Sequence, residues 1–386
     1  MKYQRDRAWM EVDLDILGDN WRTIRQNIQP GAEIVVVVKA NAYGLGAVPI
    51  ARELERLGCR NFGVACIEEA MELREAGVGG HVLILGVIPE EYIELMFQWD
   101  FSVPVSSLSQ AEYYSRLAQR YGQTLKTHVA ADVGMSRFGL VLDGQMEQAV
   151  AEALAMARLP GLAWQGVMTH FTGMENPWER EFDDHQIGLF LTFCDRLDAA
   201  GLKLPRHCSC SAITQLHPEC HLDMIRVSAL PFGLQPTLYR GFSTRQMFAL
   251  RARIWHIKEV PLGTPVGYGP LAYTRRRTRI AVIPYGFGDG IHRIIGNRCK
   301  MLVHGKRARQ IGKLCMDYCM LDITDIPEAK VWDTVTIIGQ DGEENISVFE
   351  MADLYPGSPC EVSSSIGART PRLYLKGGEL VEDGAE

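Results

Sequence analysis

The sequence predicts two domains: an N-terminal (β/α)₈ barrel of the TIM type over residues 1–243 and a mainly β domain over residues 244–386. Three observations support this prediction. Short apolar runs alternate with amphipathic stretches over the first 240 residues, a pattern typical of βαβ units on a parallel sheet. Eight such runs in about 240 residues fit a closed barrel better than an open sheet. After residue 243 the helical periodicity gives way to short alternating runs separated by turn residues.

Eight apolar runs are the expected barrel strands. In chain order they are IVVVV (34–38), NFGVAC (61–66), HVLILG (81–86), FSVPV (101–105), THVAAD (127–132), WQGVMTH (164–170), RHCSCS (206–211) and MIRVSAL (224–230). The stretches between most of them carry apolar residues three and four positions apart, as in AVPIARELERLG (47–58), and glycine closes several of them. Each run and the stretch that follows it therefore form one strand and its covering helix.

The second domain is expected to consist mainly of β-hairpins. Its apolar runs are MFALRARIWHIKEV (247–260), TRIAVIPYGF (278–287), KMLVHGKRARQIG (300–312), CMLDIT (319–324) and VWDTVTIIG (331–339). Glycine, proline and aspartate separate these runs, and such residues favour tight turns.

Composition and charge restrict the class of protein to which this chain can belong. The chain has 386 residues, 47% of them hydrophobic, and a net charge of −7, which argue for a globular protein without a nucleic-acid surface. The stretch TRRRTR (274–279) fits a solvated strand edge or turn better than a phosphate patch. No apolar run approaches the roughly 18 residues of a transmembrane helix, and the N-terminus lacks an apolar signal segment. We expect a cytoplasmic protein with no membrane partner.

Cysteine usage excludes a disulfide scaffold and argues against a metal site. Ten cysteines in 386 residues are too sparse for disulfide-based folding, and reduced thiols fit the cytoplasm. The groups HCSC (207–210) and CMDYC (315–319) lack the paired C-x-x-C spacing that zinc prefers. We therefore expect no bound metal.

Lys39 is the first candidate for chemistry, because it ends the apolar run at 34–38. The carboxyl ends of barrel strands carry the reactive groups of this fold. A partly desolvated lysine favours its neutral amine, which can attack an aldehyde and form a Schiff base. This indicates a carbonyl substrate or pyridoxal phosphate, with a surface lysine as the alternative.

Seven stretches in order along nearly the whole chain resemble the alanine racemases, which are fold-type III pyridoxal-phosphate enzymes. They are VVKANAYGLG (37–46), ADVGMSRFGL (131–140), GVMTHF (166–171), SCSAITQLHPECHLDMIRVSALPFGL (209–234), VGYGPLAYTRRRTRIAVIPYGFGDG (266–290), IGKLCMDYCMLDIT (311–324) and SIGARTPRLY (365–374). The first resembles the family's lysine motif and the fifth its tyrosine motif. A single short match is weak, but seven in the right order and spacing are very specific.

The resemblance implies a two-base racemase. Lys39 holds pyridoxal 5'-phosphate covalently and acts as acid and base on one face of the substrate Cα, while Tyr268 acts on the opposite face. Two proton-transfer groups on opposite faces are what a racemase needs. In the family this tyrosine comes from the partner's second domain, so the resemblance implies a homodimer with shared active sites.

The resemblance also implies the remaining site residues. Arg226 hydrogen-bonds the pyridine nitrogen, which then stays unprotonated because arginine keeps its proton; a salt bridge to Asp223 is the alternative reading. The other expected residues are Tyr43, Ser211, Ser228 and Ala229 for the phosphate, His170 over the cofactor ring, His207 beside Arg226, and Arg137 with the Met316 N–H for the substrate carboxylate. Ser211 also resembles a helix cap before AITQLH, and helix N-termini favour phosphate.

Four positions depart from the family pattern. Ala130 stands where many relatives have a lysine, often carbamylated, so Arg137 lacks that anionic partner. Leu45 replaces a histidine, Phe287 replaces a tyrosine, and Ala368 replaces the tyrosine that often precedes the C-terminal arginine motif. We expect these changes to make the pocket less polar and, at Ala368, wider.

We therefore expect an enzyme that interconverts L- and D-alanine and supplies D-alanine for peptidoglycan. A wider pocket leaves a broader-specificity or serine racemase as the alternative, because an apolar pocket rejects one hydroxyl only weakly. A fold-type III decarboxylase is less favoured, since that family uses a glycine-rich phosphate loop and a cysteine from the second domain. The tyrosine motif and Arg226 also argue against it. A non-catalytic pyridoxal-phosphate carrier would not need the second domain.

Overall fold

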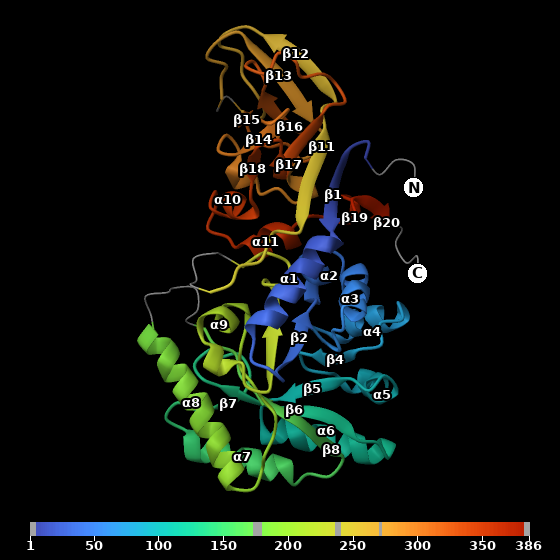
Figure 1. The fold of residues 1–386 in the computed structure, drawn as a ribbon, viewed down its shortest axis with the longest axis vertical. Coiled ribbons are helices and arrows are strands. Elements are labelled where there is room, and N and C mark those ends of the chain that lie inside the picture. The colour runs from blue at the N-terminus through green and yellow to red at the C-terminus, as the bar shows by residue number, and fades with distance from the viewer. Residues whose placement is uncertain (1–4, 173–179, 236–240, 270–271, 382–386) are drawn as a thin grey trace.

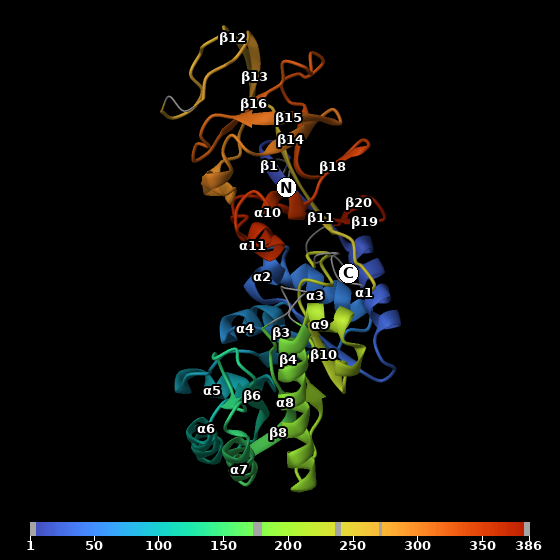
Figure 2. The ribbon, with the colours of Figure 1, turned by 90° about the vertical axis from the view of Figure 1, so that its left-hand side faces the viewer.

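The computed structural model describes residues 5–172, 180–235, 241–269 and 272–381. The protein is elongated, with a barrel at one end and a domain rich in β-structure at the other (Figures 1 and 2). The predicted fold class, a TIM-type barrel followed by a mainly β domain, is confirmed.

Eight parallel strands form the barrel, and each lies within or overlaps one of the eight predicted runs. They are β2 (Glu33–Val37), β3 (Asn61–Val64), β4 (His81–Ile84), β5 (Ser102–Val105), β6 (Leu125–Asp132), β8 (Leu162–Met168), β9 (Arg206–His207) and β10 (Met224–Val227). The sheet order is β10-β2-β3-β4-β5-β6-β8-β9. The backbone N–H of Asp223 donates to Arg206 O at 3.2 Å, and that of Arg226 donates to Ser209 O at 2.9 Å. These two bonds join β9 to β10 and close the ring.

Helices alternate with these strands, as the periodicity predicts. They are α1 (Leu14–Asn27), α2 (Lys39–Tyr43), α3 (Ala47–Arg56), α4 (Ile67–Glu75), α5 (Ile93–Gln98), α6 (Leu108–Tyr121), α7 (Met146–Ala157), α8 (Arg180–Ala199) and α9 (Ser211–Leu216). In α3 the buried face includes Ile50, Ala51 and Leu54, and Gly58 follows the helix with a φ of +93°. The apolar spacing therefore marks the buried face of the helix, and the glycine follows its end, as expected.

The second domain is a long, mostly antiparallel sheet. Its strands are β11 (Phe248–Arg253), β12 (His256–Val260), β13 (Thr278–Ile283), β14 (Lys300–Val303), β15 (Lys306–Ile311), β16 (Cys319–Asp322), β17 (Thr334–Asp341), β18 (Glu344–Ile346), β19 (Arg372–Lys376) and β20 (Glu379–Val381). Two short helices, α10 (Val348–Ala352) and α11 (Pro359–Ser364), lie between this sheet and the barrel (Figure 1).

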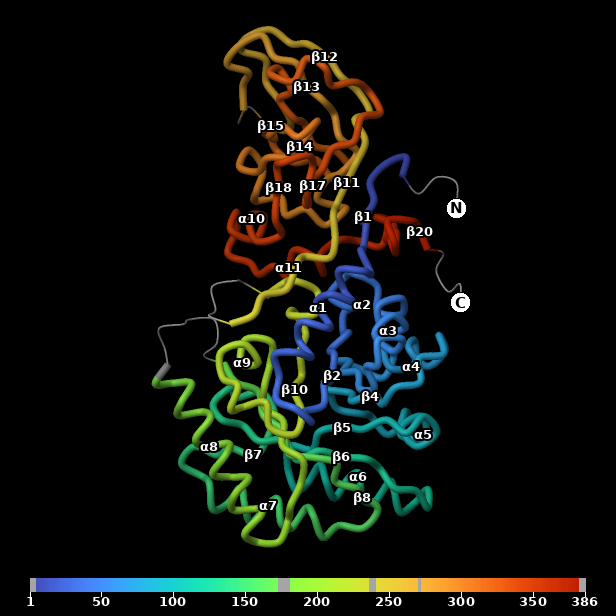
Figure 3. Tube along the Cα trace, in the orientation of Figure 1, coloured from blue at the N-terminus to red at the C-terminus, as the bar shows by residue number. Residues whose placement is uncertain are grey.

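The N-terminal strand β1 (Ala8–Asp13) pairs within the second sheet, although the chain enters the barrel directly after it. It pairs antiparallel with β11 and parallel with β19. Ala8, Met10 and Val12 bury their side chains in the core, as alternation on a strand requires. Figure 3 shows the chain beginning beside the second domain before α1 leads it into the barrel. The local hydrophobic pattern of the sequence does not predict pairing with strands more than 200 residues away in the chain.

The turn that follows β2 packs tightly against β19. Gly46 has a φ of +105°, and a Cβ at this position would lie 1.7 Å from the Tyr374 hydroxyl oxygen. That hydroxyl donates to Leu45 O at 3.1 Å, and Arg372 Nε donates to Gly44 O at 2.9 Å. These contacts fix the end of the first barrel strand against the second domain.

Gly46→Ala should therefore destabilise the protein by about 3 kcal/mol, since it adds a steric clash to a strained φ. Denaturant unfolding monitored by fluorescence measures the change. Gly58→Ala is the matched control, because Gly58 also has a positive φ but nothing lies within 4 Å of its added Cβ. We expect it to cost only about 1 kcal/mol. Equal losses in the two variants would contradict the role of the Tyr374 contact.

Among the described residues, we find no helix with both the length and the apolar character needed to cross a bilayer. Within the same residues, His, Cys, Asp and Glu side chains form no group of three placed to hold a metal ion.

Candidate active site

A cavity of about 290 Å³ opens at the carboxyl ends of the barrel strands. Its wall includes Lys39 after β2, Ala130 in β6, His170 after β8, and Arg226 and Ser228 at the end of β10. Residues that are far apart in the sequence meet here because parallel strands end on the same side of the barrel.

Lys39 opens an unusual left-handed turn. The four residues Ala40 to Tyr43 all have φ between +50° and +55°, a conformation that disfavours large or β-branched side chains. The two alanines of KANAYG suit this turn, although Asn41 and Tyr43 adopt the same conformation. Two side chains support the turn: Glu69 accepts the Ala40 N–H at 2.6 Å, and Asn41 accepts the Ala47 N–H at 2.8 Å.

Glu69 is a residue that the sequence did not reveal. Its other carboxylate oxygen accepts the Ala65 N–H at 2.7 Å, so one side chain links the ends of β2 and β3. In the sequence it resembles any acidic residue in the first turn of a helix, and only the register of the two strands gives it this role.

The left-handed turn places Tyr43 in the wall of the same cavity. Burial raises the pKa of Tyr43 to about 12, although a hydrogen bond with Ser228 opposes the shift. The phenol is therefore a neutral donor at physiological pH.

Ser211 lies beside this corner of the cavity but does not cap a helix, which corrects the sequence prediction. Cys210 occupies the N-cap position of α9, and Ser211 is the first helical residue. Its hydroxyl accepts the N–H of Ser228 at 3.0 Å and that of Leu230 at 3.2 Å. Ser211 therefore organises the loop after β10, the loop that contains Ala229.

Arg226 is buried, and it pairs with carbonyls and an imidazole rather than with a carboxylate. It donates to His207 Nδ1 at 3.0 Å, to His207 O at 2.8 Å and to Thr169 O at 2.5 Å. The alternative salt bridge does not form, since the Asp223 carboxylate accepts the backbone N–H of Arg206 at 2.7 Å. The guanidinium thus keeps its charge next to the cavity, and no acid among the described residues forms an ion pair with it.

Behind Arg226 the hydrogen bonds continue inward. His207 Nε2 lies 3.1 Å from His128 Nδ1. Burial holds the pKa of His128 down at about 3 and that of His207 well below its usual value, with the Arg226 charge acting in the same direction on both. Both imidazoles are therefore neutral. His128 was not among the predicted site residues, because a histidine in the middle of an apolar strand gives no distinctive signal.

His170 and Arg137 form another part of the cavity wall. Burial, assisted by the charges of Arg226, Arg137 and Lys39, lowers the pKa of His170 to about 3. Arg137 follows a tight turn in which the Asp132 carboxylate accepts three consecutive backbone N–H groups. Arg137 makes no ion pair with any residue that the structure describes.

Tyr268 and Met316 lie outside this cavity. Tyr268 is 64% exposed in the segment between β12 and β13, and Met316 is 56% exposed between β15 and β16. Figure 1 places β12 and β13 at the end of the molecule farthest from the barrel. Within one protomer the structure therefore does not bring these two residues to Lys39.

The four departures from the family pattern occupy different environments. Ala130 lines the cavity, as expected. Leu45 is fully buried in the hydrophobic core and is not among the residues that line the cavity, so the expectation that it alters the pocket is wrong. Phe287 is half-buried in the second domain, and Ala368 is exposed next to Arg369, which pairs with Asp289 at 2.8 Å.

The residues present fit pyridoxal 5'-phosphate. Lys39 can bind the aldehyde, the Tyr43–Ser228 corner offers neutral donors for the phosphate, and Arg226 offers a charged donor for the pyridine nitrogen. Lys39 follows β2, the first strand of the barrel. A barrel with a lysine in this position, joined to a mainly β domain, defines a fold-type III pyridoxal-phosphate protein.

The comparisons with known proteins identify the family within this class. The alanine racemase N-terminal domain model matches residues 12–236, and the alanine racemase C-terminal domain model matches residues 247–374. The chain therefore belongs to the alanine racemase family.

Relatives match over nearly the whole chain. The alanine racemase of Desulforamulus reducens is 36% identical over 375 residues, which cover 96% of this chain and 100% of the relative. The structure of alanine racemase from Clostridium difficile 630 superposes with a TM-score of 0.90 at 31% identity and covers 97% of each chain. The alanine racemase of Bartonella henselae with covalently bound pyridoxal phosphate gives a TM-score of 0.86 at 25% identity, covering 96% of this chain and 99% of that one.

Proposed function

We propose that this protein is a pyridoxal-phosphate-dependent isomerase that interconverts L- and D-alanine. The observation that supports this most directly is the meeting of Lys39 and Arg226 in one cavity of an alanine racemase family chain. The structure from Bacillus anthracis in the same family is that of an alanine racemase with bound L-Ala-P, which agrees with an alanine-sized substrate. D-Alanine for peptidoglycan is the product that this activity supplies.

When bound, the cofactor acidifies the Cα–H bond of the substrate by delocalising its electron pair. Lys39 would hold the cofactor covalently between turnovers, and its amine, released when the amino group of the substrate replaces it, would take the Cα proton on one face or return it there. Tyr268 donates or accepts the proton on the opposite face. Each direction of the reaction needs both residues, since one removes the proton and the other replaces it.

Arg226 determines how strongly the bound cofactor would withdraw electrons from the substrate. It remains protonated, and so it donates to the pyridine nitrogen without transferring its proton. The ring therefore withdraws electrons less strongly than a pyridinium ring, which favours reprotonation at Cα over transfer of the amino group. The neutral His207 accepts from Arg226 at 3.0 Å and so orients the guanidinium.

The remaining site residues bind the cofactor and the substrate and orient them. Tyr43, Ser211, Ser228 and the backbone N–H of Ala229 would hold the phosphate, and the neutral His170 would lie beside the ring. Arg137 and the Met316 N–H bind the substrate carboxylate. Because position 130 is alanine, the carbamylated lysine of many relatives cannot pair with Arg137 here, and we propose that a chloride or another acid takes its place.

The exposure of Tyr268 and Met316 supports a homodimer with shared active sites. Each residue lies on the second domain, remote from the barrel cavity of its own chain. A second copy, arranged with its second domain over the barrel mouth, supplies both residues and excludes water from the site.

Incubation of the holoenzyme with L-alanine in D₂O tests the activity. We expect D-alanine carrying deuterium at Cα. Release of CO₂ would instead indicate a decarboxylase, and a yellow but inert protein would indicate a cofactor carrier. Either outcome would overturn the proposal.

The substrate range is tested at Ala368, where the side chain ends at Cβ and the residue is exposed in one protomer. We expect measurable serine racemisation, with a kcat/KM preference for L-alanine over L-serine below about a thousandfold. Ala368→Tyr should suppress serine more than alanine, because the phenol fills the space that the serine hydroxyl needs. Ala368→Ser, which adds little volume, serves as the control. A larger preference in the unmodified enzyme would contradict the wider pocket.

A further inference from the structure

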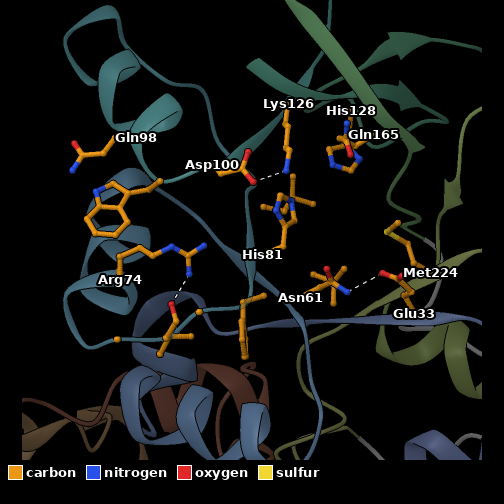
Figure 4. Close-up of a pocket in the computed structure, with 17 residues that line it drawn as sticks. Glu33, Asn61, Arg74, His81, Gln98, Asp100, Lys126, His128, Gln165 and Met224 are labelled. Carbon is orange, nitrogen blue, oxygen red and sulfur yellow. Dashed lines mark hydrogen bonds and ion pairs between the residues drawn. The ribbon is translucent and has the colours of Figure 1, made fainter. Parts of the chain in front are cut away.

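A second cavity, of about 750 Å³, opens at the other end of the barrel (Figure 4). Glu33, Asn61 and His81 line it, and they are the first residues of β2, β3 and β4. Lys126 and His128 of β6 line it as well; they are two positions apart on one strand and therefore face the same side. The cavity thus lies at the amino ends of the strands, opposite the site of Lys39.

A chain of hydrogen bonds runs from Arg226 through His207 to His128, which lines this cavity. The direction of these bonds determines which nitrogen of each imidazole carries the proton. Arg226 can only donate, so His207 Nδ1 must accept, and the proton of this neutral ring sits on Nε2. His207 Nε2–H then donates to His128 Nδ1 at 3.1 Å. The His128 proton is consequently on Nε2. Arg226 therefore dictates which nitrogen of each ring carries the hydrogen.

His128 Nε2–H is a buried donor that lacks an acceptor. The residue is 4% exposed, and Nε2 finds no partner among the described residues. Buried polar groups in proteins almost always have a hydrogen-bond partner. Since His128 lines the cavity, the missing acceptor is best supplied from the cavity.

The carboxylates of this cavity already have partners. Asp100 pairs with Lys126 at 2.5 Å, and Glu33 accepts from the Asn61 amide at 2.9 Å. His81 Nε2 lies 2.9 Å from the Ser102 hydroxyl, and burial, with the Lys126 charge, lowers the pKa of His81 to about 4. None of these groups accepts a hydrogen bond from His128 Nε2 in the structure.

A cation that forms no ion pair among the described residues lies on the same cavity wall, although the charges of Glu55 and Asp100 act on it. Arg74 donates to Val78 O at 2.5 Å but makes no ion pair with a residue that the structure describes. Arg74 offers positive charge, Lys126 shares its charge with Asp100, and His128 offers a directed N–H. These groups are complementary to a small anion that carries acceptor oxygens.

We propose that this cavity binds a small carboxylate, one oxygen of which accepts the His128 Nε2–H while Arg74 balances its charge, with the Lys126–Asp100 pair beside it. The carboxylate completes the hydrogen-bond chain that starts at Arg226 and holds the histidine tautomers in place. The site lies at the opposite end of the barrel from Lys39, and its existence does not depend on the proposed racemase activity.

The full-length holoenzyme, labelled with ¹⁵N-histidine, tests the site with acetate as the probe. We expect a saturable downfield shift of the His128 Nε2–H proton resonance as acetate is added to about 100 mM, which detects binding in the millimolar range. Acetate bound near Lys39 would act on this proton only through Arg226 and His207, so the His207 Nε2–H resonance is followed as well: binding in this cavity should shift the His128 signal more than the His207 signal, and binding near Lys39 the reverse. No shift, or the same shift with sodium chloride at equal ionic strength, would overturn the proposal in favour of water as the acceptor.

Two variants remove positive charge from the cavity, and each has a matched control. Lys126→Met should weaken acetate binding about tenfold or more, because Asp100 is left unpaired near the anion. Lys306→Met removes a lysine that pairs with Glu328 on the second domain and should have no effect. Arg74→Gln should also weaken binding, whereas Arg52→Gln, which likewise removes a donor to a backbone carbonyl, should not. Unchanged acetate affinity in both cavity variants would contradict the proposed charge balance.

Discussion

Replacing Lys39 with alanine should reduce racemisation of alanine by at least ~10⁴-fold in both directions, since one side chain supplies both the covalent attachment and one of the two bases. Its position supports this expectation. The amine projects into the cavity at the end of β2, and the left-handed turn behind it is held by Glu69 and Asn41. Coupled assays that follow D-alanine and L-alanine separately measure the loss.

Borohydride reduction provides an independent measurement of the same assignment. It should attach the cofactor irreversibly to Lys39, and peptide mapping should recover the label there. Lys126→Ala is the control, because Lys126 lies at the opposite end of the barrel, and this variant should be labelled as the unmodified enzyme is. A label on any other lysine, or a Lys39→Ala protein that still racemises, would refute the central assignment.

The sequence was sufficient to predict the barrel because its information is local. Each strand is a short apolar run, each helix has its own periodicity, and Lys39 stands where such a run ends. The resemblance to the family then identified the residues expected around the cofactor, although motifs carry no information on their positions in space. Those of them that line the cavity lie together at the carboxyl ends of the strands.

What the sequence did not reveal depends on contacts between distant segments. The placement of β1 depends on pairing with β11 and β19. Likewise, Leu45 was expected to alter the pocket but is buried in the core, because the turn after Lys39 directs its side chain away from the cavity.

Glu69 and His128 are examples at the site itself. Neither belongs to a motif, and each acts through one or two hydrogen bonds to a group on another element. Ser211 shows the same limit on a finer scale, since a shift of one residue at the start of α9 changes it from a cap into a support for the loop after β10. Such roles follow from register and packing, which periodicity does not encode.

The proposed shared active site predicts a result that only a dimer can produce. Tyr268→Phe should slow racemisation about 10²–10⁴-fold in both directions, because the second face of Cα loses its proton-transfer group. A mixture of the inactive Lys39→Ala and Tyr268→Phe proteins should then regain activity after subunit exchange. In the hybrid, Lys39 of one chain meets Tyr268 of the other, while the second site has lost both residues.

Random exchange of equal amounts makes about half of the dimers hybrid, each with one intact site, so about a quarter of the unmodified activity should return. The Tyr268→Phe protein mixed with a double Lys39→Ala, Tyr268→Phe variant is the control and should regain nothing. The geometry requires this outcome if the proposal is right, because Tyr268 lies on the domain remote from its own barrel mouth. A Tyr268 that acted within its own chain would leave the mixture inactive, and a fully active Tyr268→Phe protein would mean that another group serves the second face.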